Sequence, residues 1–198
     1  MKAILKTNKW KKEYNVAELT EEHPTIKNNL ALKKARVLRH RDMQGRSVIY
    51  IPAKNHSVND REIDELTQFI VFCLVRNNYS HHCWTLKFNQ KTFIIQEEAS
   101  KKSFEDVIDN FCIVFDLKNF SLTCMDYPLI KNIIWLLSRH YPERLGVCLI
   151  YNAPTVFSGC WAIIRGWLDE NTSSKVTFVN SEEDLCQYLI PDILPTDM

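Results

Sequence analysis

The chain has 198 residues, of which 45% are hydrophobic, and its formal net charge at pH 7 is +1. This length fits one domain with a sizeable core, and the near balance of charge argues against a nucleic-acid-binding protein. The balance conceals an asymmetry, because residues 1–46 carry 12 Lys and Arg against 5 Asp and Glu (+7), whereas residues 47–198 carry 13 against 19 (−6).

The first 41 residues are basic and helical in composition. We expect a helical lead-in over residues 1–41, followed by one domain over residues 42–198. The positive charge of the lead-in suits either an anionic membrane surface or an ordinary solvated helix face, and the sequence leaves both readings open.

A turn and a strand open the domain. The turn covers residues 42–45, and the strand covers residues 47–51 and ends at Pro52. Asn59 or Asp60 can cap the helix that follows, which places Ile63, Leu66 and Ile70 on one face and ends near residue 76.

Residues 77–110 form the part of the chain with the weakest pattern. Short strands are expected at residues 84–88 and 92–95, and a helical turn at residues 103–110. The His81-His82-Cys83 segment invites a metal or nucleophile interpretation. Adjacent histidines in a strand point to opposite faces, however, and no second ligand pair stands at zinc spacing, so we interpret the segment as an exposed loop.

Strands and helices then alternate. Strands are predicted at residues 111–116, 145–151 and 175–179, and helices at residues 125–140, about 156–168 and 182–189. Asp126 is the expected cap of the first of these helices, and Pro128 lies in its first turn. This alternation predicts an α/β domain with a largely parallel sheet covered by helices.

The helix near residues 156–168 has an unusually wide apolar surface. One stripe contains Phe157, Trp161, Ile164 and Leu168, and a second stripe beside it contains Cys160, Ile163 and Trp167. Such a helix lies in the middle of a domain or faces something apolar that is not protein. Periodicity alone does not choose between these two interpretations.

Several motifs together resemble the CRAL-TRIO lipid-binding domain family, which includes phosphatidylinositol transfer proteins and retinaldehyde- and tocopherol-binding proteins. They are Y-P-E-R-L-G from Tyr141, N-A-P from Asn152, F-S-x-x-W from Phe157 and L-D-x-x-T-x-x-K from Leu168. Residues 42–46, 114–117 and 192–195 add further landmarks. The resemblance implies a hydrophobic lipid pocket above a sheet floor, closed by a gate helix at residues 156–168.

The resemblance also implies a headgroup site. In the family's phosphatidylinositol transfer proteins, the Glu of Y-P-E-R and the Lys that opens the strand after the gate helix help to hold the inositol phosphate. Glu143 and Lys175 match these positions, as hydroxyl acceptor and phosphate partner. Phe111 and Ile113 stand where phosphatidylcholine-binding members carry Ser or Thr, so the match favours phosphatidylinositol or another small hydrophobic ligand.

The residues that line the pocket can be predicted from the face of each strand or helix on which they lie. Eight residues are expected to line it: Phe111, Ile113, Phe115, Phe157, Trp161, Ile164, Val176 and Phe178. The same side chains could instead fill a core, in which case the chain would be a protein-interaction or regulatory module of a larger signalling protein, such as a small-GTPase regulator.

The sequence offers no catalytic constellation. There is no G-x-S-x-G motif, and with four glycines there is no phosphate-cradling loop. We expect a non-enzymatic lipid-binding protein with no metal and no cofactor apart from its lipid ligand. Its expected partners are a phospholipid or other hydrophobic molecule, a membrane surface contacted transiently, and a protein partner under the alternative interpretation.

Cysteine usage and hydropathy bear on location. The seven cysteines are scattered singly, and five of them lie in apolar runs: Cys73, Cys112, Cys148, Cys160 and Cys186. This usage is typical of a reducing compartment without disulfides. The start of the chain lacks a signal-peptide pattern, and apolar stretches such as residues 69–75 fall short of the roughly 18–20 residues of a membrane span. We expect a cytoplasmic protein that visits membranes.

Overall fold

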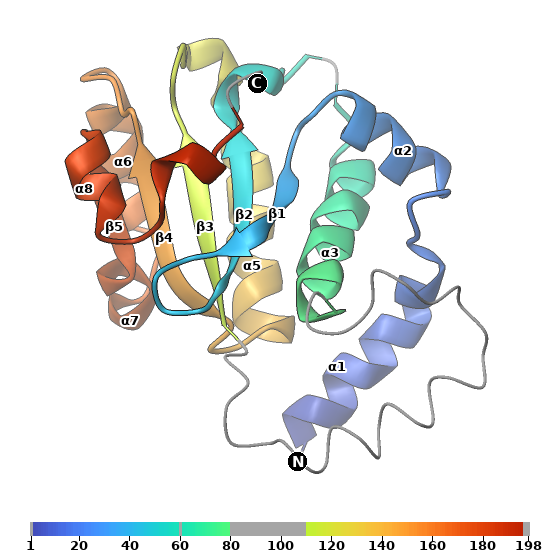
Figure 1. Ribbon diagram of the computed structural model, residues 1–198. Coiled ribbons are helices and arrows are strands. Elements are labelled where there is room, and N and C mark those ends of the chain that lie inside the picture. Colours follow the sequence, from blue (N-terminus) through green and yellow to red (C-terminus); the bar gives the residue numbers. More distant parts are fainter. Residues whose placement is uncertain (1, 60, 80–109, 196–198) are drawn as a thin grey trace.

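The structure is a computed structural model, and it describes residues 2–59, 61–79 and 110–195 (Figure 1). The two strands predicted at residues 84–88 and 92–95 and the His81-His82-Cys83 segment lie outside the described residues. So does the helical turn predicted from residue 103, apart from its last residue.

A five-stranded sheet forms the centre of the molecule. Its strands are β1 (Arg36–Arg41), β2 (Ser47–Pro52), β3 (Phe111–Asp116), β4 (Leu145–Tyr151) and β5 (Val176–Val179). They lie side by side in chain order; β1 pairs antiparallel with β2, and the other neighbours pair in parallel. The prediction of an α/β fold with a largely parallel sheet is confirmed.

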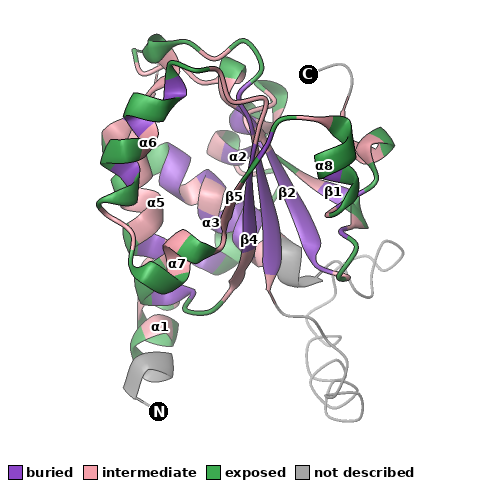
Figure 2. Cartoon of the chain, turned by 90° about the vertical axis from the view of Figure 1, so that its left-hand side faces the viewer, coloured by how far each residue is buried: buried purple, intermediate pink, exposed green. Residues whose placement is uncertain are grey.

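The helices cover the two faces of the sheet unequally. Helix α3 (Ile63–Tyr79) follows β2, α5 (Tyr127–His140) follows β3, and α6 (Phe157–Arg165) and α7 (Glu170–Ser174) follow β4. When successive connections between neighbouring parallel strands have the same handedness, their helices lie on the same face of the sheet. Figure 2 shows them on one side of the sheet and α8 (Glu182–Cys186) on the other.

The remaining elements lie outside these crossovers. Helices α1 (Lys2–Glu13) and α2 (Pro24–Ala31) precede the sheet, and short 3₁₀ turns cover Val16–Glu18, Ala53–Asn55, Leu122–Cys124 and Pro191–Ile193. Within the described residues, none of the helices has the length and apolar character that crossing a membrane requires.

Strand alternation divides the core into two layers. Ile49, Ile113 and Ile150 face α3, α5 and α6, whereas the buried side chains between them pack against the C-terminal segment. The second set includes Val48, Val114, Leu149, Val179, Leu185 and Leu189, all fully buried. Both faces of the central strands are therefore covered, which explains why their sequences are continuous apolar runs.

The predicted turn at residues 42–45 is confirmed, and it organises one end of the sheet. Gly45 adopts a left-handed backbone with φ of 78°, and the Asp42 carboxylate accepts hydrogen bonds from the backbone N–H of Gln44 and Arg46. The buried Arg46 side chain donates to Asp42 at 2.5 Å and lies against Gly146. A side chain at residue 146 would begin 2.6 Å from Arg46 Cδ, so this position needs glycine.

Two helix predictions need correction. The lead-in was expected to be helical through residue 41, but residues 36–41 form β1. Because Leu38 is its one buried side chain, this edge strand carries little apolar signal, and its pairing with β2 decides its conformation. The helix expected over residues 156–168 stops at Arg165, since the chain turns at Gly166 and Asp169 caps a separate helix, α7.

Replacing Tyr50 with Phe tests the carboxyl end of the sheet. The Tyr50 hydroxyl donates to Asp116 Oδ2 at 2.5 Å, and the same carboxylate accepts from the Lys118 backbone N–H and from Asn152. Burial of the Tyr50 hydroxyl raises its pKa, and the hydrogen bond to Asp116 raises it further. Losing one bond to a buried carboxylate should lower the free energy of unfolding by about 1.5–3 kcal/mol.

Urea denaturation measures this loss. Tyr188→Phe is the control, because the Tyr188 hydroxyl has no hydrogen bond to the residues that the structure describes, and it should change the free energy by less than about 0.5 kcal/mol. Equal effects of the two substitutions would show that the Tyr50–Asp116 bond does not stabilise the sheet.

Candidate functional site

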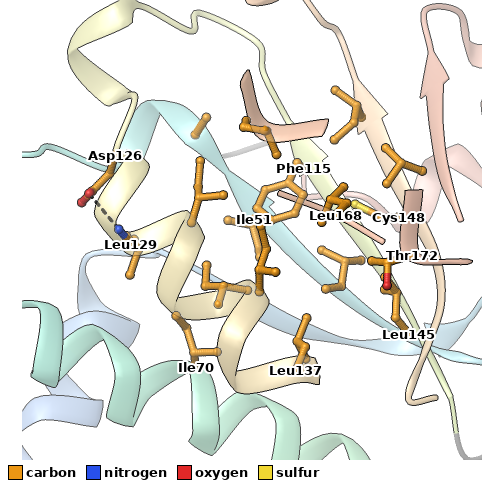
Figure 3. Close-up of a pocket in the computed structure, with 18 of the residues that line it drawn as sticks. Ile51, Ile70, Phe115, Asp126, Leu129, Leu137, Leu145, Cys148, Leu168 and Thr172 are labelled. Carbon is orange, nitrogen blue, oxygen red and sulfur yellow. Dashed lines mark hydrogen bonds between the residues drawn. The ribbon is translucent and has the colours of Figure 1, made fainter. Parts of the chain in front are cut away.

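An apolar cavity of about 520 Å³ lies between the helix-covered face of the sheet and helices α3, α5 and α6. Its floor is formed by strand residues that include Ile51, Phe115, Cys148 and Ile150. Its walls include Leu66 and Ile70 of α3, Leu129, Ile130, Ile133, Ile134 and Leu137 of α5, and Phe157, Trp161 and Ile164 of α6. Figure 3 shows labelled residues from the strands and α5 grouped around it.

Most of the residues expected in the pocket wall line this cavity, and two do not. Those that line it are Ile113, Phe115, Phe157, Trp161, Ile164 and Val176, together with Glu143 and Lys175. Phe111 is fully buried in the core at the amino end of β3. Phe178 is 38% exposed on the edge strand β5 and lines a surface groove with Trp161 and Arg165.

Helix α6 is held against the first turns of α5. The Tyr127 hydroxyl is hydrogen-bonded to the Cys160 thiol, and the Tyr127 and Trp167 rings meet edge to face at 5.7 Å. The Lys131 ammonium lies 4.6 Å from the centre of the Trp167 ring, a favourable cation–π distance. The second apolar stripe therefore packs partly on α5, whereas its remaining member, Ile163, is 48% exposed.

Polar groups gather at the two ends of the cavity. The first polar end lies beyond the C-terminal end of α5 and contains Glu143, Asn171 and Lys175. Lys175 Nζ donates to Glu143 Oε2 at 3.3 Å, and Asn171 Nδ2 donates to Glu143 Oε1 at 3.3 Å. The Glu143 side chain is 77% exposed and that of Lys175 is 23% exposed, so their ion pair contributes little to stability. Water or a ligand can therefore replace it at small cost.

Local backbone structure positions this first end. Glu143 adopts a left-handed backbone with φ of 58°, which is uncommon for a residue with a side chain. Asp169 caps α7 by accepting from the Thr172 backbone N–H at 2.9 Å and from the Thr172 hydroxyl at 2.6 Å. These hydrogen bonds lower the pKa of Asp169. The short helix α7 places Asn171 within hydrogen-bond distance of Glu143.

The second polar end lies at the start of α5 and contains His56, Arg61 and Asp126. The predicted cap is confirmed, since Asp126 Oδ1 accepts from the Leu129 backbone N–H at 3.0 Å. Arg61 donates from Nε to Oδ2 and from Nη2 to Oδ1, the latter at 2.9 Å. His56 Nε2 lies 3.1 Å from Oδ2.

Burial and hydrogen bonding set the charges at the second end. Burial tends to raise the pKa of Asp126, but the bonds from Arg61, the Leu129 N–H and His56 outweigh it, so the pKa is lowered and the carboxylate stays ionised. Burial also lowers the pKa of His56 below 6.5; the charges of Lys34 and Arg61 act in the same direction, and the bond to Asp126 opposes them. The imidazole is therefore neutral near pH 7.

Sequence reasoning identified Asp126 only as a helix cap, and it found neither His56 at the cavity nor the contact of Arg61 with Asp126. Asp126 is separated by 70 residues from His56 and by 65 residues from Arg61, so no local spacing signals the cluster. The short helix α7 was also missed, although Asp169 and Thr172 stand at capping distance in the sequence.

The two polar ends are separated by the length of α5. Its 14 residues span about 21 Å at 1.5 Å per residue. In Figure 3, Asp126 and Thr172 lie on opposite sides of the apolar side chains. An elongated molecule with an apolar body and a polar group at an end matches this arrangement. Among the described residues, no cluster of three or more His, Cys, Asp or Glu could hold a metal ion.

Comparisons with known proteins found both a matching family and similar sequences. The sequence model of the CRAL/TRIO domain matches residues 33–198. The CRAL-TRIO domain-containing protein C3H8.02 of Schizosaccharomyces pombe is 30% identical over 97% of this chain, which spans 39% of that protein. The phosphatidylinositol transfer protein CSR1 of Eremothecium gossypii is 27% identical over 87% of this chain, which spans 34% of that protein.

A solved structure shows the same fold. The crystal structure of Sfh5 aligns with a TM-score of 0.65 at 17% identity, covering 89% of this chain and 59% of that chain. At this identity the likeness concerns the arrangement of the sheet and helices.

The pH dependence of stability tests the second polar end. The lowered pKa of Asp126 means that its contribution to stability is fully present above its ordinary value of 3.8 and is lost as the pH falls through the lowered value. Asp126→Asn should therefore lower the free energy of unfolding near pH 7. The deficit should shrink as the pH falls below about 4.

Urea titrations of both proteins across this range measure the difference. Asp64→Asn, on an exposed carboxylate of α3, is the control and should leave the pH profile unchanged. A constant deficit at every pH would mean that the Asp126 charge is not linked to folding.

Proposed function

This chain belongs to the CRAL/TRIO domain family, and from that premise we propose that it binds a lipid in the cavity between the sheet and helices α3, α5 and α6 and carries it between membranes. The observation that supports the proposal most directly is the cavity itself, which has an apolar body of about 520 Å³ and polar groups at two ends. Small-molecule pockets commonly enclose about 300–1,000 Å³. A relative named as a phosphatidylinositol transfer protein supports the transfer function.

The first polar end is the proposed headgroup site. Lys175 supplies a positive charge for a phosphate, and the Glu143 carboxylate accepts from inositol hydroxyls. The two groups now contact each other at 3.3 Å in an exposed setting, so a ligand can separate them without leaving a buried charge unpaired. Phosphatidylinositol is therefore the proposed ligand for this end, with its acyl chain against the apolar walls.

Helix α6 is the proposed gate. It supplies Phe157, Trp161 and Ile164 to the cavity, and it is joined to α5 by the contacts of Cys160 and Trp167 described above. Separating α6 from α5 would open the apolar cavity along its length. A membrane surface would cover the apolar side chains exposed by this motion, as water would not.

The proposed role is binding and transport, with no bond made or broken. Among the described residues, Asp126 and Asp169 at the cavity cap helices and Glu143 pairs with Lys175, an arrangement without a nucleophile beside a general base. We propose that the protein acts in the cytoplasm and contacts membranes transiently, when the ligand enters or leaves.

Replacing Trp161 with Asp tests the gate and the cavity. A carboxylate among the apolar lining would disfavour an acyl chain, so lipid loading should fall by more than about tenfold. Native mass spectrometry of the purified protein, followed by extraction and identification of bound lipid, measures the loading. Circular dichroism establishes that the variant is folded.

Trp135→Asp is the matched control, because Trp135 is 49% exposed on α5 and is not among the cavity residues. Normal loading of a folded Trp161→Asp protein would contradict the gate assignment. A wild-type protein that neither carries nor takes up any lipid would contradict the transport function and favour a protein-interaction module.

Replacing Lys175 with Ala tests the headgroup site. Loss of the ammonium should reduce occupancy by phosphatidylinositol about five- to tenfold, the effect of one charge-assisted contact. Incubation with vesicles of phosphatidylinositol in phosphatidylcholine, followed by native mass spectrometry, measures the occupancy. Lys118→Ala, an exposed lysine beyond β3, should leave it unchanged. Unchanged occupancy in Lys175→Ala would discard the headgroup assignment and keep the cavity.

A further inference from the structure

The second polar end of the cavity, formed by His56, Arg61 and Asp126, is not part of the proposed headgroup site. We propose that it recognises a hydroxyl group on an otherwise apolar ligand, with His56 Nδ1 as the hydrogen-bond acceptor. The ligand class is a neutral lipid that carries a hydroxyl group, such as a long-chain alcohol or a sterol. This inference rests on the proposed lipid-binding function and assigns chemistry to the opposite end of the same cavity.

The Asp126 carboxylate fixes the orientation and the proton of the His56 ring. Asp126 is ionised and can only accept, so the proton of the neutral imidazole lies on Nε2, which faces Oδ2 at 3.1 Å. The other ring nitrogen, Nδ1, then carries a lone pair. It has no hydrogen-bond partner within the described part of the chain, and His56 lines the cavity.

Asp126 itself is already committed to other groups. Its two oxygens accept from Arg61, His56 and the Leu129 N–H, and the residue is only 3% exposed. Arg61 is correspondingly held by both carboxylate oxygens. Arg61 and Asp126 therefore hold the His56 ring in place. The His56 Nδ1 acceptor is the group that remains available to a ligand.

The chemistry of this acceptor favours a hydroxyl over charged groups. A carboxylate has no proton to give to Nδ1, and it would also approach the Asp126 carboxylate. An ammonium could donate, but Lys34 and Arg61 place two positive charges beside the ring. A neutral hydroxyl donates without either penalty, and the apolar walls accommodate the rest of the molecule.

Acidification should abolish this recognition. The groups that act on the ring are Asp126 at the start of α5, Arg61 before α3 and Lys34 before β1. Once the imidazole is protonated, both ring nitrogens are donors and the acceptor is lost. Affinity for an alcohol should therefore fall as the pH drops through the lowered pKa of His56, whereas affinity for a carboxylate should rise.

Displacement of an apolar, environment-sensitive dye from the cavity tests the inference. The probes are 1-hexadecanol, methyl hexadecyl ether and hexadecanoate, which share an alkyl chain and differ in the terminal group. The alcohol should displace the dye from the wild-type protein at about five- to tenfold lower concentration than the ether. His56→Phe should erase this preference.

Two further variants separate recognition from structure. His56→Gln keeps an N–H for Asp126 and a carbonyl acceptor, so it should restore part of the preference for the alcohol. His40→Phe, on an exposed histidine of β1, should behave like the wild type. Circular dichroism should give the same spectrum for all four proteins.

Three outcomes would overturn the inference. Equal displacement by the alcohol and the ether in the wild type would remove the hydroxyl site and leave the lipid cavity intact. Preference for hexadecanoate over the alcohol at about pH 7.5, where the His56 imidazole is neutral, would assign the end to anions. Failure of every probe and of phosphatidylinositol to bind would overturn the lipid-binding function together with this inference.

Discussion

Every parallel connection in this sheet joins a strand to its immediate neighbour, so crossovers of one hand place α3, α5, α6 and α7 on a single face. That face carries helices with long apolar side chains, and the space they leave above β3 and β4 is the cavity. Among the residues that the structure describes, the other face is covered by the short C-terminal segment. The unequal cover is therefore a consequence of strand order, and the position of the cavity follows from it.

The two polar ends of the cavity differ in their solvation. Asp126 is nearly inaccessible to water, and its charge is stabilised by donors from Arg61, His56 and the start of α5. Glu143 keeps most of its hydration and meets Lys175 at 3.3 Å. Rearranging the second end would leave the buried charge of Asp126 unpaired, whereas rearranging the first end replaces water with ligand. A rigid recognition end and an adaptable headgroup end are the result.

The sequence predicted most of the sheet, because strands buried on both faces are continuous apolar runs and α5 has a capping Asp126 and an early proline. It also placed six of the eight expected residues at the cavity. Phe111 and Phe178 were misplaced because alternation fixes the face of a side chain but not its depth along the strand. The cluster of His56 and Asp126 was missed because its members are 70 residues apart in the chain and are brought together only by the tertiary fold.

The cover on the α8 side of the sheet has a consequence for synthesis of the chain. Leu185 and Leu189 are fully buried against strand residues such as Val48 and Val114, yet they follow all five strands in the sequence. A ribosome that adds roughly 5–20 residues per second would present the bare apolar face of the sheet for on the order of a second before these leucines emerge. The nascent domain thus passes through a stage in which a chaperone, or a second unfinished chain, competes with its own C-terminal segment for that face.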